Sequence, residues 1–315
     1  MINQIRTQYR EIRRQVFEQA TMPAEVNSQR HSENKARFRA AAEQLSNNAS
    51  LDHWASNSSE AKTGLWNHLW IKNRYAGIRA QIATNEIAQI KHLFDDYSWF
   101  SDPRWDLRSK GFQVISAGEF ARNFLDRTGP FTNLQTIGNV PKLKKIISIA
   151  RLYDQYFSQH PQAPAIEFLN HSIELEDVWA IHAGLMDIDY KGDLTALHFM
   201  MDAGFQVIKP DVVISRLLLD WGWLRYAKPD LPNDLTRDDL LGKGKYGTRY
   251  MYMKPLIYKP IIDLAREIVS GIDPQSLIDD IGWVTSNPMR EFDIFIVKSG
   301  QLPEKEFGIE RRLYS

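Results

Sequence analysis

Cysteine is absent from the 315 residues of this chain. Its absence excludes disulfides, thiolate zinc sites, cysteine nucleophiles and cysteine-ligated iron–sulfur clusters, and it favours a reducing compartment. Long apolar runs are also missing. None approaches the roughly 18 residues that a membrane span needs, and the first residues lack the apolar segment of a signal peptide. We therefore expect a soluble, cytoplasmic protein without a membrane partner.

A net charge is lacking as well, because 39 basic residues balance 39 acidic ones. A nucleic-acid-binding protein of this composition has to concentrate its basic residues locally. Glycine (17) and proline (14) are too few for a collagen-like or proline-rich chain, whereas 43% apolar and 25% charged residues are typical of a globular protein. The eight histidines are scattered without metal-ligand spacing, so we expect no catalytic metal.

Helical periodicity dominates the rest of the sequence. The stretches that predict helices are residues 1–21, a short segment about Ala40–Ala42, and residues 64–94, 117–126 and 141–158. A loop is expected over residues 47–59, which are rich in Asn and Ser. The most strand-like segment, Asp293–Val297, is too short to be distinguished from a helix by periodicity. The expected fold class is all-α or nearly so.

The most informative stretch runs from Ile188 to Leu224. Asp193 can cap a helix that Gly204 can terminate in the left-handed conformation. Pro210 disfavours helix at the residue before it, and Asp211 then occupies the N-cap position of a second amphipathic helix. The predicted unit is therefore a helix, a tight hairpin, a helix, an extended linker and an acid-capped helix.

Two short motifs in this stretch carry a family resemblance. They resemble the hairpin Leu-Pro-Gly-Val-Gly-x-Lys-Thr-Ala and the loop Pro-Val-Asp-Thr-His-Val-x-Arg of the helix-hairpin-helix (HhH-GPD) superfamily of DNA glycosylases of base excision repair. The matching residues are Ile188, Gly192, Thr195, Ala196, Asp211 and Arg216. The interval from Ala196 to Asp211 is about the one that the family uses. The run Asn287–Phe292 is similar to the start of the carboxy-terminal helix in some members, and the resemblance covers about residues 136–300.

The match is incomplete in both motifs. Asp189 and Tyr190 replace the usual Pro and first Gly of the hairpin. Lys191 stands at a usually apolar position, and Val213 replaces the His of the loop. Leu194 occupies the position where lyase-competent members carry a Schiff-base lysine. Because a leucine cannot form an imine, the resemblance implies the monofunctional branch of the family.

The resemblance implies an amino-terminal helical region over residues 1–135 and an HhH-GPD-like glycosylase region over residues 136–315. It implies that Asp211 is the catalytic carboxylate. The DNA-binding residues that it implies are Tyr190, Lys191, Gly192, Asp193, Leu194, Thr195, Lys209 and Arg216. The implied partner is double-stranded DNA, bound by a monomer. No cofactor is implied, with a monovalent cation at the hairpin as the open alternative.

These residue types suit the cleavage of a C1′–N glycosidic bond. The transition state carries positive charge on the sugar, which a nearby carboxylate stabilises while it orients the attacking water. A helix N-terminus stabilises the charged form of Asp211 by a few tenths to about 1 kcal/mol. Backbone N–H groups of the hairpin can hold a DNA phosphate without reading the base sequence. The target base leaves the stack for a pocket with aromatic and apolar walls.

Each candidate also has a structural alternative. Asp211 is a good helix cap whether or not it is catalytic, Arg216 can form a buried ion pair, and Lys209 can be a solvated lysine. The tryptophans considered for the base pocket are Trp66, Trp70, Trp221 and Trp223, and most tryptophans are core residues. Two basic runs, residues 142–151 and 243–259, fit phosphate contacts but are also typical of a solvated face.

The leading hypothesis is a monofunctional DNA glycosylase that leaves an abasic site. Two substrates remain open within it: an ordinary lesion such as an alkylated base, or a deliberately modified base in phage DNA, which would make the protein an antiviral defence enzyme. The long amino-terminal region and the irregular hairpin favour the second. The alternative from another class is a non-catalytic helix-hairpin-helix DNA-binding protein that uses Asp211 only as a cap.

Overall fold

The computed structural model describes residues 1–22, 28–47, 51–75, 83–85, 87–88, 91, 97, 140–169, 177–188, 190, 192–246 and 251–300. Throughout these residues the regular elements are α-helices and short 3-10 helices, and none is a strand. The all-α fold class is thus confirmed for the described part of the chain. The strand-like segment 293–297 lies inside helix α16 (Pro288–Ser299). Among the same residues, no helix is both long and apolar enough to cross a membrane.

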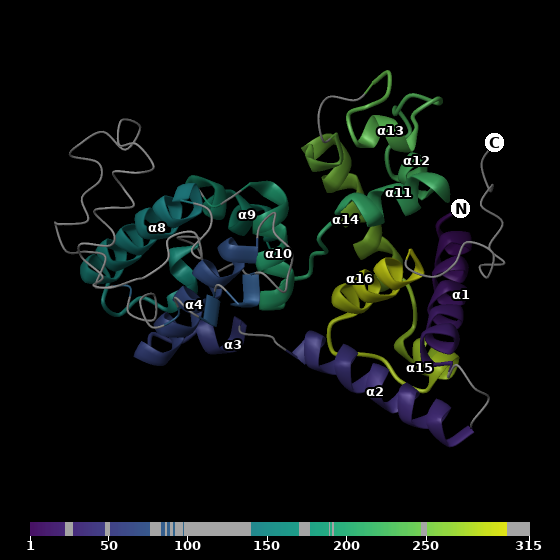
Figure 1. Cartoon of the computed structure of the whole chain (residues 1–315), viewed down its shortest axis with the longest axis horizontal. Coiled ribbons are helices and arrows are strands. Elements are labelled where there is room, and N and C mark those ends of the chain that lie inside the picture. The colour runs from purple at the N-terminus through teal and green to yellow at the C-terminus, as the bar shows by residue number, and fades with distance from the viewer. Residues whose placement is uncertain are drawn as a thin grey trace. The chain divides into compact units, whose positions relative to one another are not determined.

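Contacts divide the chain into two compact units. We call Met1–Ala49 together with Met200–Ser315 the terminal unit, and Ser50–Phe199 the inserted unit. The first two helices therefore pack with the last ones, as the purple, green and yellow elements of Figure 1 show. The predicted boundary between residues 135 and 136 lies outside the described residues, and that division stays a prediction.

The terminal unit is built around α16. Its other elements are α1 (Ile2–Thr21), α2 (Ser28–Asn47), α11 (Val212–Asp220), α12 (Trp223–Ala227), α13 (Arg237–Leu240), η4 (Met251–Met253), α14 (Pro255–Ser270) and α15 (Pro274–Ile281). Helix α16 contacts α1, α2, α11 and α14 (Figure 1). It buries Phe292, Phe295 and Ile296 completely, and the ring of Phe292 lies 5.0 Å from that of Tyr9. Elements from both ends of the chain thus share one core.

The inserted unit packs a second, aromatic core. In the part of it that the structure describes, its elements are α3 (Leu51–Trp54), α4 (Ser59–Tyr75), α8 (Val140–Gln159), η3 (Ala165–Phe168), α9 (Val178–Asp187) and the start of α10 (Asp193–Ala203). Tyr153 of α8 is fully buried, stacks edge-on against Phe168 at 4.6 Å and donates its hydroxyl to the carbonyl of Lys62. Helix α4 contacts α3, α8 and η3 and joins these elements.

Several predicted helix bounds differ from the observed ones. The amphipathic helix at residues 1–21 is α1, and the one at 141–158 is α8. The short helix predicted about Ala40–Ala42 is the 20-residue α2, and α3 lies in the predicted loop. Helix α2 is poor in apolar residues, but Phe38 packs its ring against Phe17, Trp283 and Phe295. Tertiary packing therefore extends a helix that local propensity predicts only in part. The predicted helix at 117–126 lies outside the described residues.

Candidate functional site

A glycine ends the helix that leads to the candidate carboxylate. Gly204 has a φ of 104°, its N–H donates to the carbonyl of Met201, and the next N–H, of Phe205, donates to Met200. The positive φ confirms the predicted left-handed end of this helix, and the two hydrogen bonds form a Schellman arrangement. The chain then extends, and a tight turn about Pro210 brings the N–H of Asp211 to 2.7 Å from the carbonyl of Lys209.

Asp211 caps helix α11, as predicted. Its Oδ1 accepts hydrogen bonds from the N–H groups of Val213 at 2.8 Å and Ile214 at 3.2 Å. The side chain is half-buried, so the carboxylate keeps some contact with solvent. The two N–H donors and the helix N-terminus both stabilise its negative charge.

Side chains from α14 and α16 fasten the segment that delivers Asp211. Asn287, the N-cap of α16, donates through Nδ2 to the carbonyl of Gly204 at 3.4 Å. Arg266 of α14 donates through Nε to the carbonyl of Gln206 at 2.9 Å. The segment between α10 and α11 is therefore tied at two backbone carbonyls before it reaches Asp211.

Arg290 joins the end of α10 to α16. Its Nη2 lies 3.1 Å from Oδ1 of Asp202, and its Nη1 lies 3.3 Å from Oδ2 of Asp293 and 2.9 Å from the sulfur of Met201. The three charged side chains are 10–12% exposed, so water screens their interactions weakly. A buried arginine thus bridges two carboxyl groups in the same unit as Asp211.

Asp293 differs from an ordinary carboxyl group in its protonation. Burial raises its pKa to about 7, and the negative charges of Asp211 and Asp202 act in the same direction. The positive charges of Arg290 and Lys209 oppose the rise in pKa. Carboxyl groups whose pKa values are separated by their surroundings and by each other's charge are typical of acid–base sites.

The hairpin (Tyr190–Thr195) belongs to the inserted unit, whereas Asp211 belongs to the terminal unit. Gly192 is exposed, adopts a φ of 73° and accepts through its carbonyl from the N–H groups of Thr195 and Ala196. Helix α10 begins at Asp193, which corrects the predicted cap by one residue. The first N–H groups of such a helix point outward along its axis, as a phosphate contact requires.

The remaining hairpin side chains are mostly structural. Tyr190 is buried, donates its hydroxyl to the carbonyl of Leu69 at 3.0 Å and packs against Phe199. Leu194 is also buried, and Asp193 lies 3.6 Å from Nε2 of His182. Lys191 lies outside the described residues.

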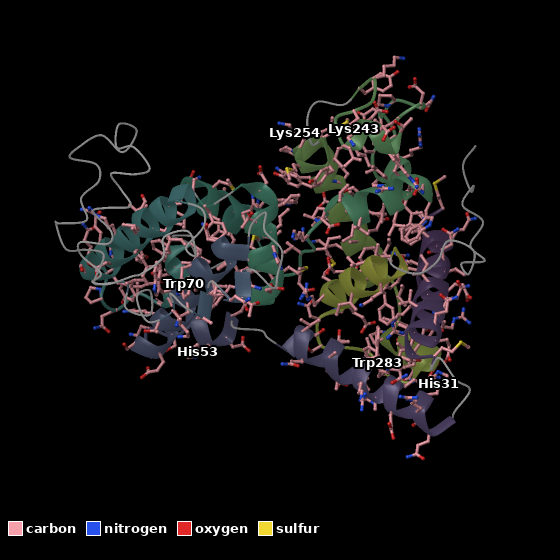
Figure 2. All side chains as sticks on the ribbon, in the orientation of Figure 1. His31, His53, Trp70, Lys243, Lys254 and Trp283 are labelled. Atoms are coloured by element: carbon pink, nitrogen blue, oxygen red, sulfur yellow. The ribbon has the colours of Figure 1, made fainter. Side chains whose placement is uncertain are left out.

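The tryptophans predicted for a base pocket are all buried. Trp66 and Trp70 lie in the core of the inserted unit, and the indole N–H of Trp70 donates to Asn67. Trp70 is labelled in Figure 2. In the terminal unit Trp223 donates to Gln8 and lies 5.1 Å from the ring of Trp221. This burial is what the core alternative predicts, and the base-pocket role stays a prediction.

Several basic side chains of the terminal unit are candidates for binding an anion such as a DNA phosphate. Arg216 of α11 is half-buried and forms no ion pair with the described residues, and its phosphate-binding role stays a prediction. Lys209 is half-buried and its charge acts on Asp293. Lys243 and Lys254 of the second basic run are exposed in the same unit, as Figure 2 shows.

Neither a search for metal ligands nor a comparison with known proteins indicates a function. Within the described ranges, no group of three or more His, Asp or Glu side chains is arranged to hold a metal ion. Comparison of the chain with protein-family models, curated proteins and solved structures gives no match. The function therefore has to be inferred from the residues of the site itself.

The sequence analysis did not identify three charged residues of the site, namely Asp202, Arg290 and Asp293. The signal was present in part, because α16 places Arg290, Glu291 and Asp293 among the apolar residues of a helix. Charged residues inside an apolar helix are rarely buried unless they are paired. The other partners of Arg290, however, are Met201 and Asp202, and Met201 is 89 positions away in the chain.

Proposed function

We propose that this chain is a monofunctional DNA glycosylase of the HhH-GPD type, with Asp211 as the catalytic carboxylate. One observation carries the proposal: the acid that follows the glycine-terminated helix and the Lys-Pro turn is held by its own helix N-terminus and remains half-open to solvent. A cap alone does not need the two side-chain ties at Gly204 and Gln206 that fix this segment.

The proposed reaction breaks the C1′–N bond of a flipped nucleotide. The bonding electrons leave with the base, which takes up a proton, and the sugar becomes positively charged. The carboxylate of Asp211 stabilises that charge and orients a water molecule, which adds to C1′ and releases a proton. The products are a free base and an abasic strand. Leu194 offers no amine at the position of the family's Schiff-base lysine, so no covalent intermediate at that position is part of the scheme.

Binding is assigned to backbone groups and nearby cations. The start of α10 at Asp193 supplies outward N–H groups for a phosphate, and Gly192 gives the turn its left-handed backbone. Lys209 and Arg216 flank Asp211 in sequence and supply positive charge for the DNA backbone. Such contacts are insensitive to base sequence, so the excised base has to be selected by its pocket.

The test uses genomic DNA from varied sources, including phage DNAs that carry different base modifications. Each DNA is incubated with the protein and then with alkali, which breaks strands at abasic sites. We expect breaks with the wild-type protein on at least one DNA and none with Asp211→Asn. Breaks in ordinary alkylated DNA indicate repair, and breaks confined to modified phage DNA indicate defence. DNA binding without breaks on any DNA would replace the glycosylase with a non-catalytic DNA-binding protein.

A further inference from the structure

The buried carboxyl group of Asp293 takes no part in the chemistry proposed above. It lies on α16 and its side chain is only 11% exposed, so it has little access to a substrate. Its position is nonetheless tied to the site, because α16 contacts α11, the helix that Asp211 caps. Near the end of α16, Gly300 approaches Val213 and Leu217 of α11 so closely that an added Cβ would lie within 3.0 Å of both.

We propose that Asp293 is a positioning residue for Asp211: it is the buried member of a carboxyl pair and sets the charge around the carboxylate that meets the substrate. This inference rests on the proposed glycosylase function for its effect on catalysis. The pairing of the two carboxyl groups can be tested without any activity.

The groups that face Asp293 come from three segments. Arg290 lies one turn earlier on α16 and is 3.3 Å away. Asp202 lies at the end of α10, where it shares Arg290 with Asp293. Asp211 and Lys209 lie on the segment before α11, and their charges act on Asp293 with opposite sign. Two positive and two negative groups thus surround this carboxyl, and burial decides the balance in favour of its neutral form.

Arg290 favours the charged form of Asp293, but the cost of burial outweighs this attraction. A single guanidinium serves both Asp202 and Asp293, and its remaining contact is the sulfur of Met201. The negative charges of Asp211 and Asp202 both oppose the ionisation of Asp293. A proton on Asp293 removes this repulsion between carboxyl groups.

Loss of this proton changes the field at Asp211. Burial raises the pKa of Asp293 to about 7, so the group is neutral in mildly acidic solution and negative in mildly alkaline solution. The second negative charge then adds to that of Asp211 and favours a positively charged sugar in the transition state. We therefore expect the bond-breaking step to gain from ionisation of Asp293.

The first experiment follows the carboxyl carbon of Asp293 by NMR in the full chain, with ¹³C-labelled aspartate and Asp293→Asn to assign the signal. We expect a midpoint near pH 7 in the wild type. Asp211→Asn removes one facing negative charge and should lower that midpoint by about 0.5 pH or more. Asp230→Asn removes a carboxyl group that is 69% exposed in the same unit and should leave the midpoint unchanged. An ordinary midpoint near pH 4, or one that ignores Asp211→Asn, overturns the inference.

The second experiment compares single-turnover base release by the wild type and Asp293→Asn from pH 6 to 8.5. The ratio of the two rates cancels the titration of the substrate base. We expect the ratio to rise about three-fold or more in favour of the wild type across pH 7. A ratio independent of pH, with an active enzyme, contradicts the inference and leaves the glycosylase intact. A shifted NMR midpoint without any base release instead removes the proposed function and keeps the carboxyl pair.

Discussion

Arg13 and Glu291 are 278 positions apart in the chain and form an ion pair of 2.6 Å in which neither side chain is more than 1% exposed. The guanidinium also donates to the carbonyls of Leu277 and Trp283. The second oxygen of Glu291 accepts from the N–H of Thr285 at 2.7 Å. All three guanidinium nitrogens of Arg13 and both carboxylate oxygens of Glu291 are therefore hydrogen-bonded. The pair joins α1 to α16, the helix that also carries Arg290 and Asp293.

Glu291→Ala should destabilise the terminal unit strongly. The substitution leaves the charge of Arg13 buried without its partner, which costs about 3–5 kcal/mol in comparable cases. Glu11→Ala is the matched control. Glu11 pairs with Arg14 on the surface of α1, the helix that also carries Arg13, and its side chain is 41% exposed. Its loss should cost less than about 1 kcal/mol. Urea unfolding measures both free energies, and similar values for the two variants would contradict the structural role of the pair.

The pH dependence of stability should reflect Asp293. An unfolded aspartate titrates near pH 4, whereas burial raises the pKa of folded Asp293 to about 7. Between these values the unfolded chain has lost a proton that the folded protein keeps, so the free energy of unfolding falls as the pH rises. Above pH 7 the loss is complete and amounts to about 4 kcal/mol.

Asp293→Asn cannot titrate and escapes this loss. We expect it to gain in melting temperature relative to the wild type as the pH rises from 4 to 8, with most of the gain above pH 5. Asp230→Asn serves as the exposed control. A difference between Asp293→Asn and the wild type that stays constant over this range would show that the folded carboxyl group titrates normally.

Two substitutions of Asp211 separate its roles as cap and catalyst. Asn caps a helix about as well as Asp, so Asp211→Asn should change stability by only a few tenths of a kcal/mol. Asp211→Ala loses the hydrogen bonds to Val213 and Ile214 and should cost about 1 kcal/mol. Both variants should lose base release by orders of magnitude. If Asp211→Asn released base at the wild-type rate, Asp211 would be a cap alone.

Gly192 tests the hairpin as a DNA anchor. An added Cβ meets no atom within 4 Å, so Gly192→Val is strained only by the φ of 73°, at about 1–3 kcal/mol. Gly282→Val is a close control, because Gly282 has a φ of 84° and equally open surroundings. We expect Gly192→Val to weaken binding to all DNA sequences alike, and Gly282→Val to leave binding unchanged. Normal binding by folded Gly192→Val rejects the hairpin. Lys191→Ala should flatten the salt dependence by about one phosphate.

Borohydride should trap no covalent adduct between the protein and DNA. Leu194 replaces the lysine that would form an imine, and it is only 8% exposed. The abasic strand should therefore stay intact until alkali is added. Gel electrophoresis after borohydride treatment checks this expectation. A strong adduct band would assign lyase chemistry to another amine of the chain.

The parts of the site that depend on neighbouring residues could be predicted from the sequence. Gly204 ends its helix and Asp211 caps the next one through hydrogen bonds that span two to five positions. Asp293 could not be predicted, because its neighbour Arg290 contacts Met201, which is 89 positions away. Helix α2 follows the same rule: Phe38 fixes it through rings that the sequence places far from it. Local patterns carry local structure, whereas burial and pKa depend on the assembled core.

The terminal unit is formed by two separate segments of the chain, and this division constrains the order of folding during synthesis. Helix α1 is made early, but Glu291 follows Arg13 by 278 positions. At roughly 5–20 residues per second this interval is on the order of tens of seconds. The inserted unit is continuous in the chain and is complete before Met200–Ser315 has left the ribosome. During that time the buried face of α1, formed by Ile5, Ile12 and Val16, lacks α16, and it is the surface that a chaperone on the nascent chain would cover.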